Sequence, residues 1–149
     1  MSDAVPAEQT NPWATVGAEP ELAQEGIWVD DFIVTGWRIR VRSASSMPAK
    51  RAQDKMFQQR RSIITANSGM VPAEIRDRMD AEMCRVLIVD WEYIPDPANP
   101  SQMLPCNPDT IMAIATHPQY GPVFRTEVHT IANNQAFFRA DVLADIAKN

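Results

Sequence analysis

The segment Trp37-Arg38-Ile39-Arg40-Val41-Arg42 alternates apolar and basic residues with a strict period of two. This period is typical of a β-strand with one face on a core, so the apolar residues are expected to face inward and the arginines outward. The preceding residues 27–34 are rich in aromatic and β-branched side chains, and Thr35-Gly36 supplies turn chemistry. The sequence therefore predicts a β-hairpin over about residues 27–42. Since an isolated hairpin is marginally stable in water, it must pack on helices or on another chain.

After the hairpin, apolar residues recur at three- and four-residue spacing, which is typical of amphipathic helices. Two such segments, about 48–66 and 72–91, are separated by the stop signal Asn67-Ser68-Gly69 and are expected to form an antiparallel helical hairpin. Residues 95–106 contain four prolines and are expected to form a loop. Asn107 followed by Pro108 marks another helix start. Three further helices are expected at about residues 108–116, at 122–132 and from 135 onward. The predicted fold class is α+β, mostly α, with a hairpin followed by about five helices.

The chain has 149 residues and a net charge of −5, and this length suits one domain with a tail. Residues 1–25 hold five acidic residues and no Lys or Arg, with little to bury besides Trp13 and Leu22. Such a composition cannot repay the entropy of ordering. We therefore expect a flexible acidic arm over residues 1–25 and a single α-rich domain over residues 26–149.

Charge is unevenly distributed within the predicted domain. The segment Arg38–Arg61 holds eight bases against one acid, whereas Glu74–Asp96 holds seven acids against three bases. A domain with one basic and one acidic segment can pair with another copy through them. Alternatively, both segments are solvated helix faces. The basic segment is also the candidate for contacting nucleic acid. The net negative charge and the absence of aromatic residues interleaved with these bases make a nucleic-acid partner the weaker interpretation.

Residue types that carry chemistry are scarce, with two Cys, two His and five Gly in the chain. His117 and His129 have no Cys or carboxylate at helical spacing to complete a metal site, and there is no nucleophile elbow or glycine-rich phosphate loop. We therefore expect no catalytic residue, no metal and no cofactor. Cys84 and Cys106 are expected to be reduced thiols of a cytosolic protein, because two Cys form no disulfide framework and neither a signal peptide nor a membrane span is apparent.

The order of features resembles a known family. A hairpin and a basic helical segment lead to a helix that ends in Asp90-Trp91-Glu92, and a proline-bearing Leu104–Asp109 segment precedes the final helices. Over about residues 26–149 this resembles the tail assembly chaperones of long-tailed bacteriophages. The resemblance implies a non-catalytic protein of the host cytoplasm that coats the tape measure protein before the tail tube polymerises and is displaced as tube subunits assemble.

Two other functions remain open at this stage. One is a virion structural component, such as a head–tail connector or a tail completion protein, and the other is a nucleic-acid-binding regulator. The expected partners are the tape measure protein, further copies of the chain and, less directly, the tail tube protein, with no membrane. Aromatic residues anchor interfaces and Met provides adaptable apolar surface, although each of these side chains could equally pack in the core. The partner-binding candidates are Trp28, Trp37, Met56, Met79, Met83 and Trp91.

Overall fold

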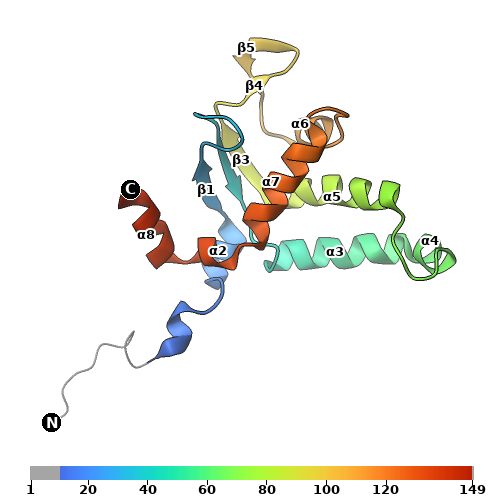
Figure 1. The fold of residues 1–149 in the computed structure, drawn as a ribbon, viewed down its shortest axis with the longest axis horizontal. Helices are drawn as coiled ribbons and strands as arrows, with labels where there is room; N and C mark the ends of the chain where they lie inside the picture. Colours follow the sequence, from blue (N-terminus) through green and yellow to red (C-terminus); the bar gives the residue numbers. More distant parts are fainter. Residues whose placement is uncertain (1–10, 149) are drawn as a thin grey trace.

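The computed structural model describes residues 11–148 and has a mixed α/β architecture (Figure 1). Its main sheet is antiparallel with the order β1-β2-β3, and a second sheet pairs β4 with β5. The strands are β1 (Ile27–Asp30), β2 (Arg38–Val41), β3 (Ile88–Glu92), β4 (Pro95–Asp96) and β5 (Asn99–Met103). The helices are α2 (Pro20–Glu25), α3 (Met47–Gln59), α4 (Arg61–Ala66), α5 (Ala73–Leu87), α6 (Pro108–Ala115), α7 (Gly121–Asn133) and α8 (Ala140–Lys148), with 3-10 turns η1 (Pro12–Thr15) and η2 (Gln135–Phe138).

The predicted hairpin is present as β1 and β2, with Ile39 and Val41 fully buried and the arginines on the opposite face. It is joined by a third strand that the sequence did not indicate, because Ile39 of β2 also pairs with Trp91 of β3. The expected helix over 72–91 therefore ends at Leu87, and Trp91 lies on a strand. The apolar run 86–89 suits either structure. A strand here satisfies the backbone groups along the open edge of β2, which explains the outcome.

Helices α3, α4 and α5 form a helical arm, defined here as Met47–Leu87, that extends away from the sheet (Figure 1). The single helix expected over 48–66 is divided at Arg60, which has φ −110° and ψ 13°. Arg60 bridges to α5 because its Nη2 donates to both carboxylate oxygens of Glu82 at 2.8 and 2.9 Å. The break thus coincides with the ion pair that fastens α3 to α5.

The proline-rich segment 95–106 is more regular than expected, because Pro95 pairs with Met103 in the β4–β5 hairpin. A two-stranded sheet consists only of edge strands, where a residue without an N–H group is tolerated. Every residue of β5 is exposed.

The acidic arm was expected to be flexible over residues 1–25, and this expectation fails for residues 11–25. Helix α2 packs Leu22 and Ala23 on the core, and the Ala23 carbonyl accepts a hydrogen bond from the Ser43 N–H at 2.9 Å. Two apolar side chains of this proline-initiated turn are enough to dock the helix on the core, although its other four residues are exposed. Residues 1–10 lie outside the described part of the chain.

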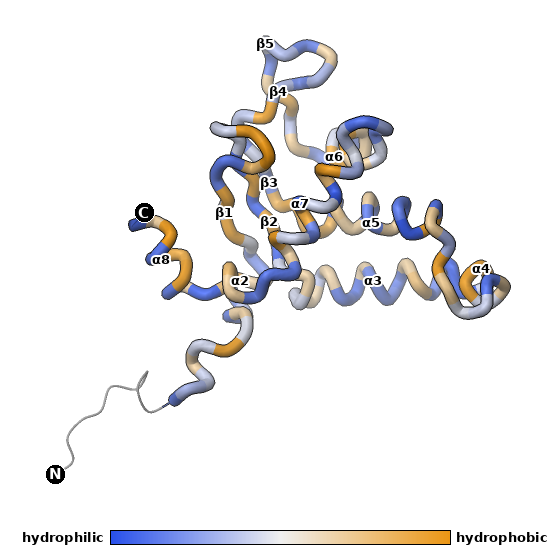
Figure 2. The backbone as a smooth tube through the Cα atoms, viewed as in Figure 1, coloured by the Kyte–Doolittle hydropathy of each residue, from blue (hydrophilic) through white to orange (hydrophobic). Residues whose placement is uncertain are grey.

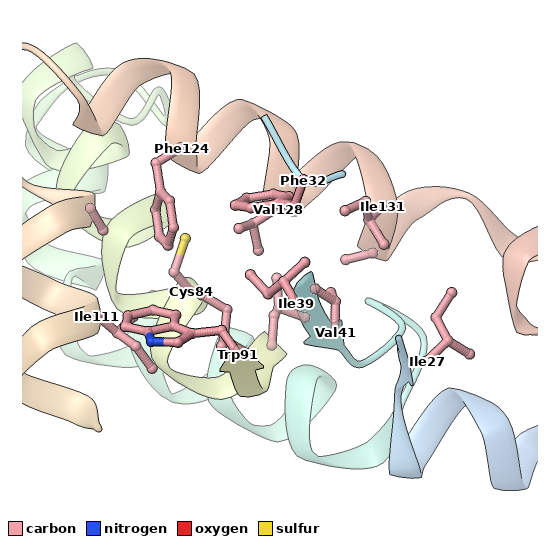
Figure 3. Packing of buried hydrophobic residues seen from close by; sticks show 14 of the residues in the cluster. Ile27, Phe32, Ile39, Val41, Cys84, Trp91, Ile111, Phe124, Val128 and Ile131 are labelled. Atoms are coloured by element: carbon pink, nitrogen blue, oxygen red, sulfur yellow. The ribbon is translucent and has the colours of Figure 1, made fainter. Parts of the chain in front are cut away.

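Helix α7 covers the inner face of the sheet. Figure 3 shows Val128 and Ile131 over Ile39 and Val41 of β2, and all four are buried. Phe124, also buried, points toward Cys84 and Trp91. At the C-terminus, α8 has no buried residue. No helix within residues 11–148 is long and apolar enough to cross a membrane.

Candidate protein-binding surfaces

The outer face of the sheet carries the arginines that the sequence offered as phosphate contacts. Arg38 Nε donates to Asp30 at 2.6 Å, its Nη1 donates to Glu92 at 3.1 Å, and its guanidinium lies 4.6 Å from the ring centroid of Trp28. Arg42 donates to the backbone carbonyls of Gln24 and Val86. Because the guanidinium groups of Arg38 and Arg42 already have acceptors within the chain, these two are poorly placed to contact phosphate, and Trp28 serves Arg38 as a stacking surface. Arg40 differs, since its buried Nε has no hydrogen-bond partner.

The methionine candidates lie inside the helical arm. Met56 and Met79 are buried and Met83 is half-buried, and all three line a cavity of about 290 Å³ between α3 and α5. Their main role is therefore packing between two helices of the same chain. A side chain that is already buried offers little surface to a partner.

A larger apolar hollow, which we call the apolar groove, lies at the end of the sheet near the β1–β2 turn. Its volume is about 570 Å³. It brings together three segments that are far apart in the sequence: the β1–β2 turn, the segment from Trp91 to β5, and the α6–α7 junction. Its lining consists of Ile33, Val34, Trp37, Trp91, Ile94, Pro95, Asp96, Pro97, Pro100, Ile114, Gln119, Tyr120, Val123 and Phe124.

The floor of the groove is rigid. Trp91 Nε1 donates to the Leu104 carbonyl at 2.7 Å, and its ring meets Phe124 edge-to-face at 6.3 Å. Phe124 makes a second edge-to-face contact with Phe32 at 5.8 Å. Such aromatic pairs are favourable beyond their buried area, so they fix the shape of the floor.

The rim of the groove is exposed. Ile33, Val34, Tyr120 and Val123 are between 42% and 52% exposed. Large apolar side chains gathered around a hollow are typical of a binding surface, whereas single exposed apolar residues are ordinary. The groove therefore presents apolar side chains that the chain itself leaves uncovered.

The β1–β2 turn holds one rim residue in a strained conformation. Ile33 has φ 64°, in the left-handed region that β-branched residues avoid. The Asp31 carboxylate accepts a hydrogen bond from the Gly36 N–H at 2.8 Å, and the Phe32 N–H donates to the Trp37 carbonyl at 3.0 Å. These bonds determine the turn, so the strain at Ile33 is imposed by its surroundings. Strain of this kind is often found at functional sites.

The α6–α7 junction is set by His117. Its Nδ1 accepts hydrogen bonds from the N–H groups of Gln119 and Tyr120 at 3.0 and 3.2 Å. Its ring stacks on Tyr120 with centroids 4.2 Å apart. The histidine is thus a structural residue that places Tyr120 at the rim.

The lining of the groove contains one acid, Asp96, and no Lys or Arg. The chain has no Lys or Arg between Arg85 and Arg125, whereas Asp90, Glu92, Asp96 and Asp109 lie in that interval. The β1–β2 turn adds Asp31 and no base. A segment that carries Lys or Arg beside its apolar residues is therefore the electrostatically matched occupant of the groove.

The remaining chemistry-bearing groups have other partners. The polar cleft between α5 and α7 contains Arg125, which donates to the Ala115 carbonyl at 2.7 Å and lies 3.8 Å from Asp77. Burial raises the pKa of the Cys84 thiol to about 12, and partial burial raises that of Cys106 to about 11. Thiols with raised pKa values are poor nucleophiles. Within residues 11–148 no cluster of three His, Cys, Asp or Glu could hold a metal ion.

Of the six residues selected from the sequence, Trp37 and Trp91 line the apolar groove, and the other four lie elsewhere. Sequence reasoning missed Ile33, Val34, Tyr120 and Val123. The available signal was weak: Ile33-Val34 directly precedes the turn residues Thr35-Gly36, and Tyr120 and Val123 flank the helix-start pair Gly121-Pro122. Apolar residues beside turn residues stay exposed more readily than those inside an element.

Comparison of the chain with protein-family models, with curated proteins and with solved structures finds no match.

Proposed function

We propose that the protein is a tail assembly chaperone of a long-tailed bacteriophage, which holds apolar segments of the tape measure protein in the apolar groove until the tail tube forms around them. The single observation that carries this proposal is the groove itself, an uncovered apolar hollow of about 570 Å³ whose lining contains the acid Asp96 and no Lys or Arg. A chaperone that shields a long helical client needs such a surface, and it needs no catalytic group.

The geometry of the groove also supports an expectation about the client segment. Apolar pockets of this size bind a few side chains from one face of a helix, spaced at three and four residues. The acids around the groove favour Lys or Arg beside those apolar side chains. We therefore expect the tape measure protein to bind through amphipathic helical segments with flanking bases.

The test is co-expression with the tape measure protein encoded in the same genome. The wild-type chain is expected to keep that protein soluble and to co-purify with it, whereas Val123→Asp is expected to lose the complex, because it places a charge on the rim. Ile146→Asp is the matched control, since Ile146 is 53% exposed on α8, outside the groove. A Val123→Asp chain that still co-purifies at wild-type yield would overturn the assignment of the groove.

The same material tests the main alternative, a structural component of the virion. A chaperone leaves the assembled tail, so the chain should be absent from purified particles analysed by mass spectrometry. If it persists there in a fixed ratio to the tail proteins, the chain is a connector or completion protein and the chaperone proposal is wrong.

A further inference from the structure

We propose that the apolar groove also binds α4 of a second copy of this chain, so that copies associate head to tail. The inference goes beyond the proposed function, because the contact between copies does not require a tail client. It rests on the surface of α4, on the distribution of charge and on the distance between α4 and the groove of its own chain.

Helix α4 contains the apolar residues Ile63, Ile64 and Ala66, yet it has no buried residue. Ile63 is 46% exposed, and Phe57 and Met70 on either side of the helix are 40% and 65% exposed. These three exposed residues belong to the segment 57–70 at the far end of the helical arm, which we call the tip, and Figure 2 shows hydrophobic residues on α4 there. Exposed apolar residues on the tip and an uncovered apolar groove on the same molecule match in polarity.

Charge supports the same pairing. Residues 47–66 carry five bases, Lys50, Arg51, Lys55, Arg60 and Arg61, against the single acid Asp54. Arg60 is paired with Glu82, and the other four bases are exposed. The lining of the groove contains the acid Asp96 and no Lys or Arg. Opposite charges around two apolar surfaces steer them together and disfavour the pairing of like with like.

The tip cannot reach the groove of its own chain. The groove lies beside the β1–β2 turn, where β2 begins, whereas α3 starts after the other end of β2 (Figure 1). The 13 residues of α3 then carry α4 a further ~20 Å along the helical arm. Arg60–Glu82 and the packing of Met56 against Met79 and Met83 hold that arm in place. The occupant must therefore belong to another copy.

A contact between two different surfaces is heterologous, so it continues from copy to copy until a ring closes or a filament grows. This distinguishes it from a symmetric dimer. One variant with a blocked groove and one with a blocked tip should each lack self-association. Mixed together they should form a heterodimer, because the intact tip of the first fits the intact groove of the second.

The experiment measures mass by light scattering after size-exclusion chromatography. Wild type is expected to exceed the 16.7 kDa of one chain. Val123→Asp alone and Ile63→Asp alone are expected to be monomers, and their equimolar mixture is expected to elute as a species of twice the chain mass and no larger. Circular dichroism checks folding, and Val34→Asp and Phe57→Asp serve as second variants of the groove and the tip.

Charge reversal gives an independent readout. Lys55→Glu combined with Arg61→Glu should weaken self-association at least tenfold, whereas Lys148→Glu on α8 should leave it unchanged. A wild-type chain that stays monomeric at millimolar concentration would overturn the inference. So would a mixture that stays monomeric, or single variants that still dimerise. Co-purification with the tape measure protein does not require self-association, so the two proposals can fail separately.

Discussion

At the scale of single residues, Ile33 combines strain and exposure. A β-branched residue at positive φ costs on the order of 1–3 kcal/mol, and Ile33 recovers only part of this by burial because it is 43% exposed. Its neighbour Val34 is similarly exposed and does not have a positive φ. The two residues therefore separate the effect of backbone strain from the effect of losing apolar surface.

We predict that Ile33→Asn stabilises the fold by about 1 kcal/mol, because Asn tolerates the left-handed region, while it weakens binding to the tape measure protein. Val34→Asn should weaken binding to a similar extent without any gain in stability. Urea denaturation measures the free energy of unfolding, and co-purification measures binding. If Ile33→Asn were no more stable than Val34→Asn, the turn would not be strained.

The two thiols allow a prediction of pH dependence. Burial raises the pKa of Cys84 to about 12, with Asp80 adding to the effect, and partial burial raises that of Cys106 to about 11, with Asp90 adding to it. In the unfolded chain both should ionise near pH 8.5. Because the native state keeps its thiols protonated, their contribution to stability is complete below about pH 8.5 and is lost as pH rises toward 11 and 12.

At pH 8 we expect the native thiols to react with a maleimide more slowly than in urea, on the order of 100-fold for Cys106 and on the order of 1,000-fold for Cys84, because so little thiolate is present. The rate should rise roughly tenfold per pH unit up to pH 10, as expected for thiols that titrate above that range. The Cys106→Ser variant isolates Cys84, which should be the slower of the two. Native labelling at pH 8 as fast as labelling in urea would contradict the raised pKa values.

At the scale of elements, the start of α6 is the most local feature of the fold. Asn107 Oδ1 accepts from the Thr110 N–H at 2.9 Å, and Thr110 Oγ1 accepts from the Asn107 N–H at 3.1 Å. Pro108 occupies the first turn of the helix. The pattern is a reciprocal capping box, and it fixes where the chain leaves the β4–β5 hairpin and enters α6.

We expect Asn107→Ala to cost about 1 kcal/mol of unfolding free energy, since it leaves a helix N–H without its acceptor. Thr110→Ala should cost a similar amount, because it also removes the hydrogen bond to the Pro105 carbonyl at 2.6 Å. In a double-mutant cycle the two changes should be less than additive, because they share one motif. Additive effects would show that the two hydrogen bonds act independently.

Elements that depend on short-range signals could be predicted from the sequence. The alternation in residues 37–42 and the Asn107-Pro108 pair identified β2 and the start of α6 where the structure has them. Strand β3 could not be predicted, because its apolar run is compatible with a helix and the open edge of β2 that recruits it lies far away in the sequence. The apolar groove could not be predicted from the sequence for the same reason. Each of its three segments appears alone as a few apolar residues near a turn, and only the fold makes them adjacent.

At the scale of the whole molecule, one groove is assigned two occupants. The client segment that we propose and α4 of a neighbouring copy would both bring apolar residues with bases beside them, and both would cover the same rim. They therefore exclude each other, and self-association lowers the fraction of chains that are free to bind a client. The apparent affinity for the client falls in proportion to that fraction.

This exclusion leads to the last prediction, which concerns Ile63→Asp. The substitution blocks the tip and leaves the groove of the same chain intact, so every copy becomes available to the client. We expect Ile63→Asp to bind a synthetic amphipathic helix from the tape measure protein several-fold more tightly than wild type at concentrations where wild type associates. The two should bind equally after dilution to monomers. Fluorescence anisotropy of the labelled peptide, measured at both protein concentrations, separates the cases. Weaker binding by Ile63→Asp at either concentration would mean that α4 itself contacts the client, and the groove would then have to share that role.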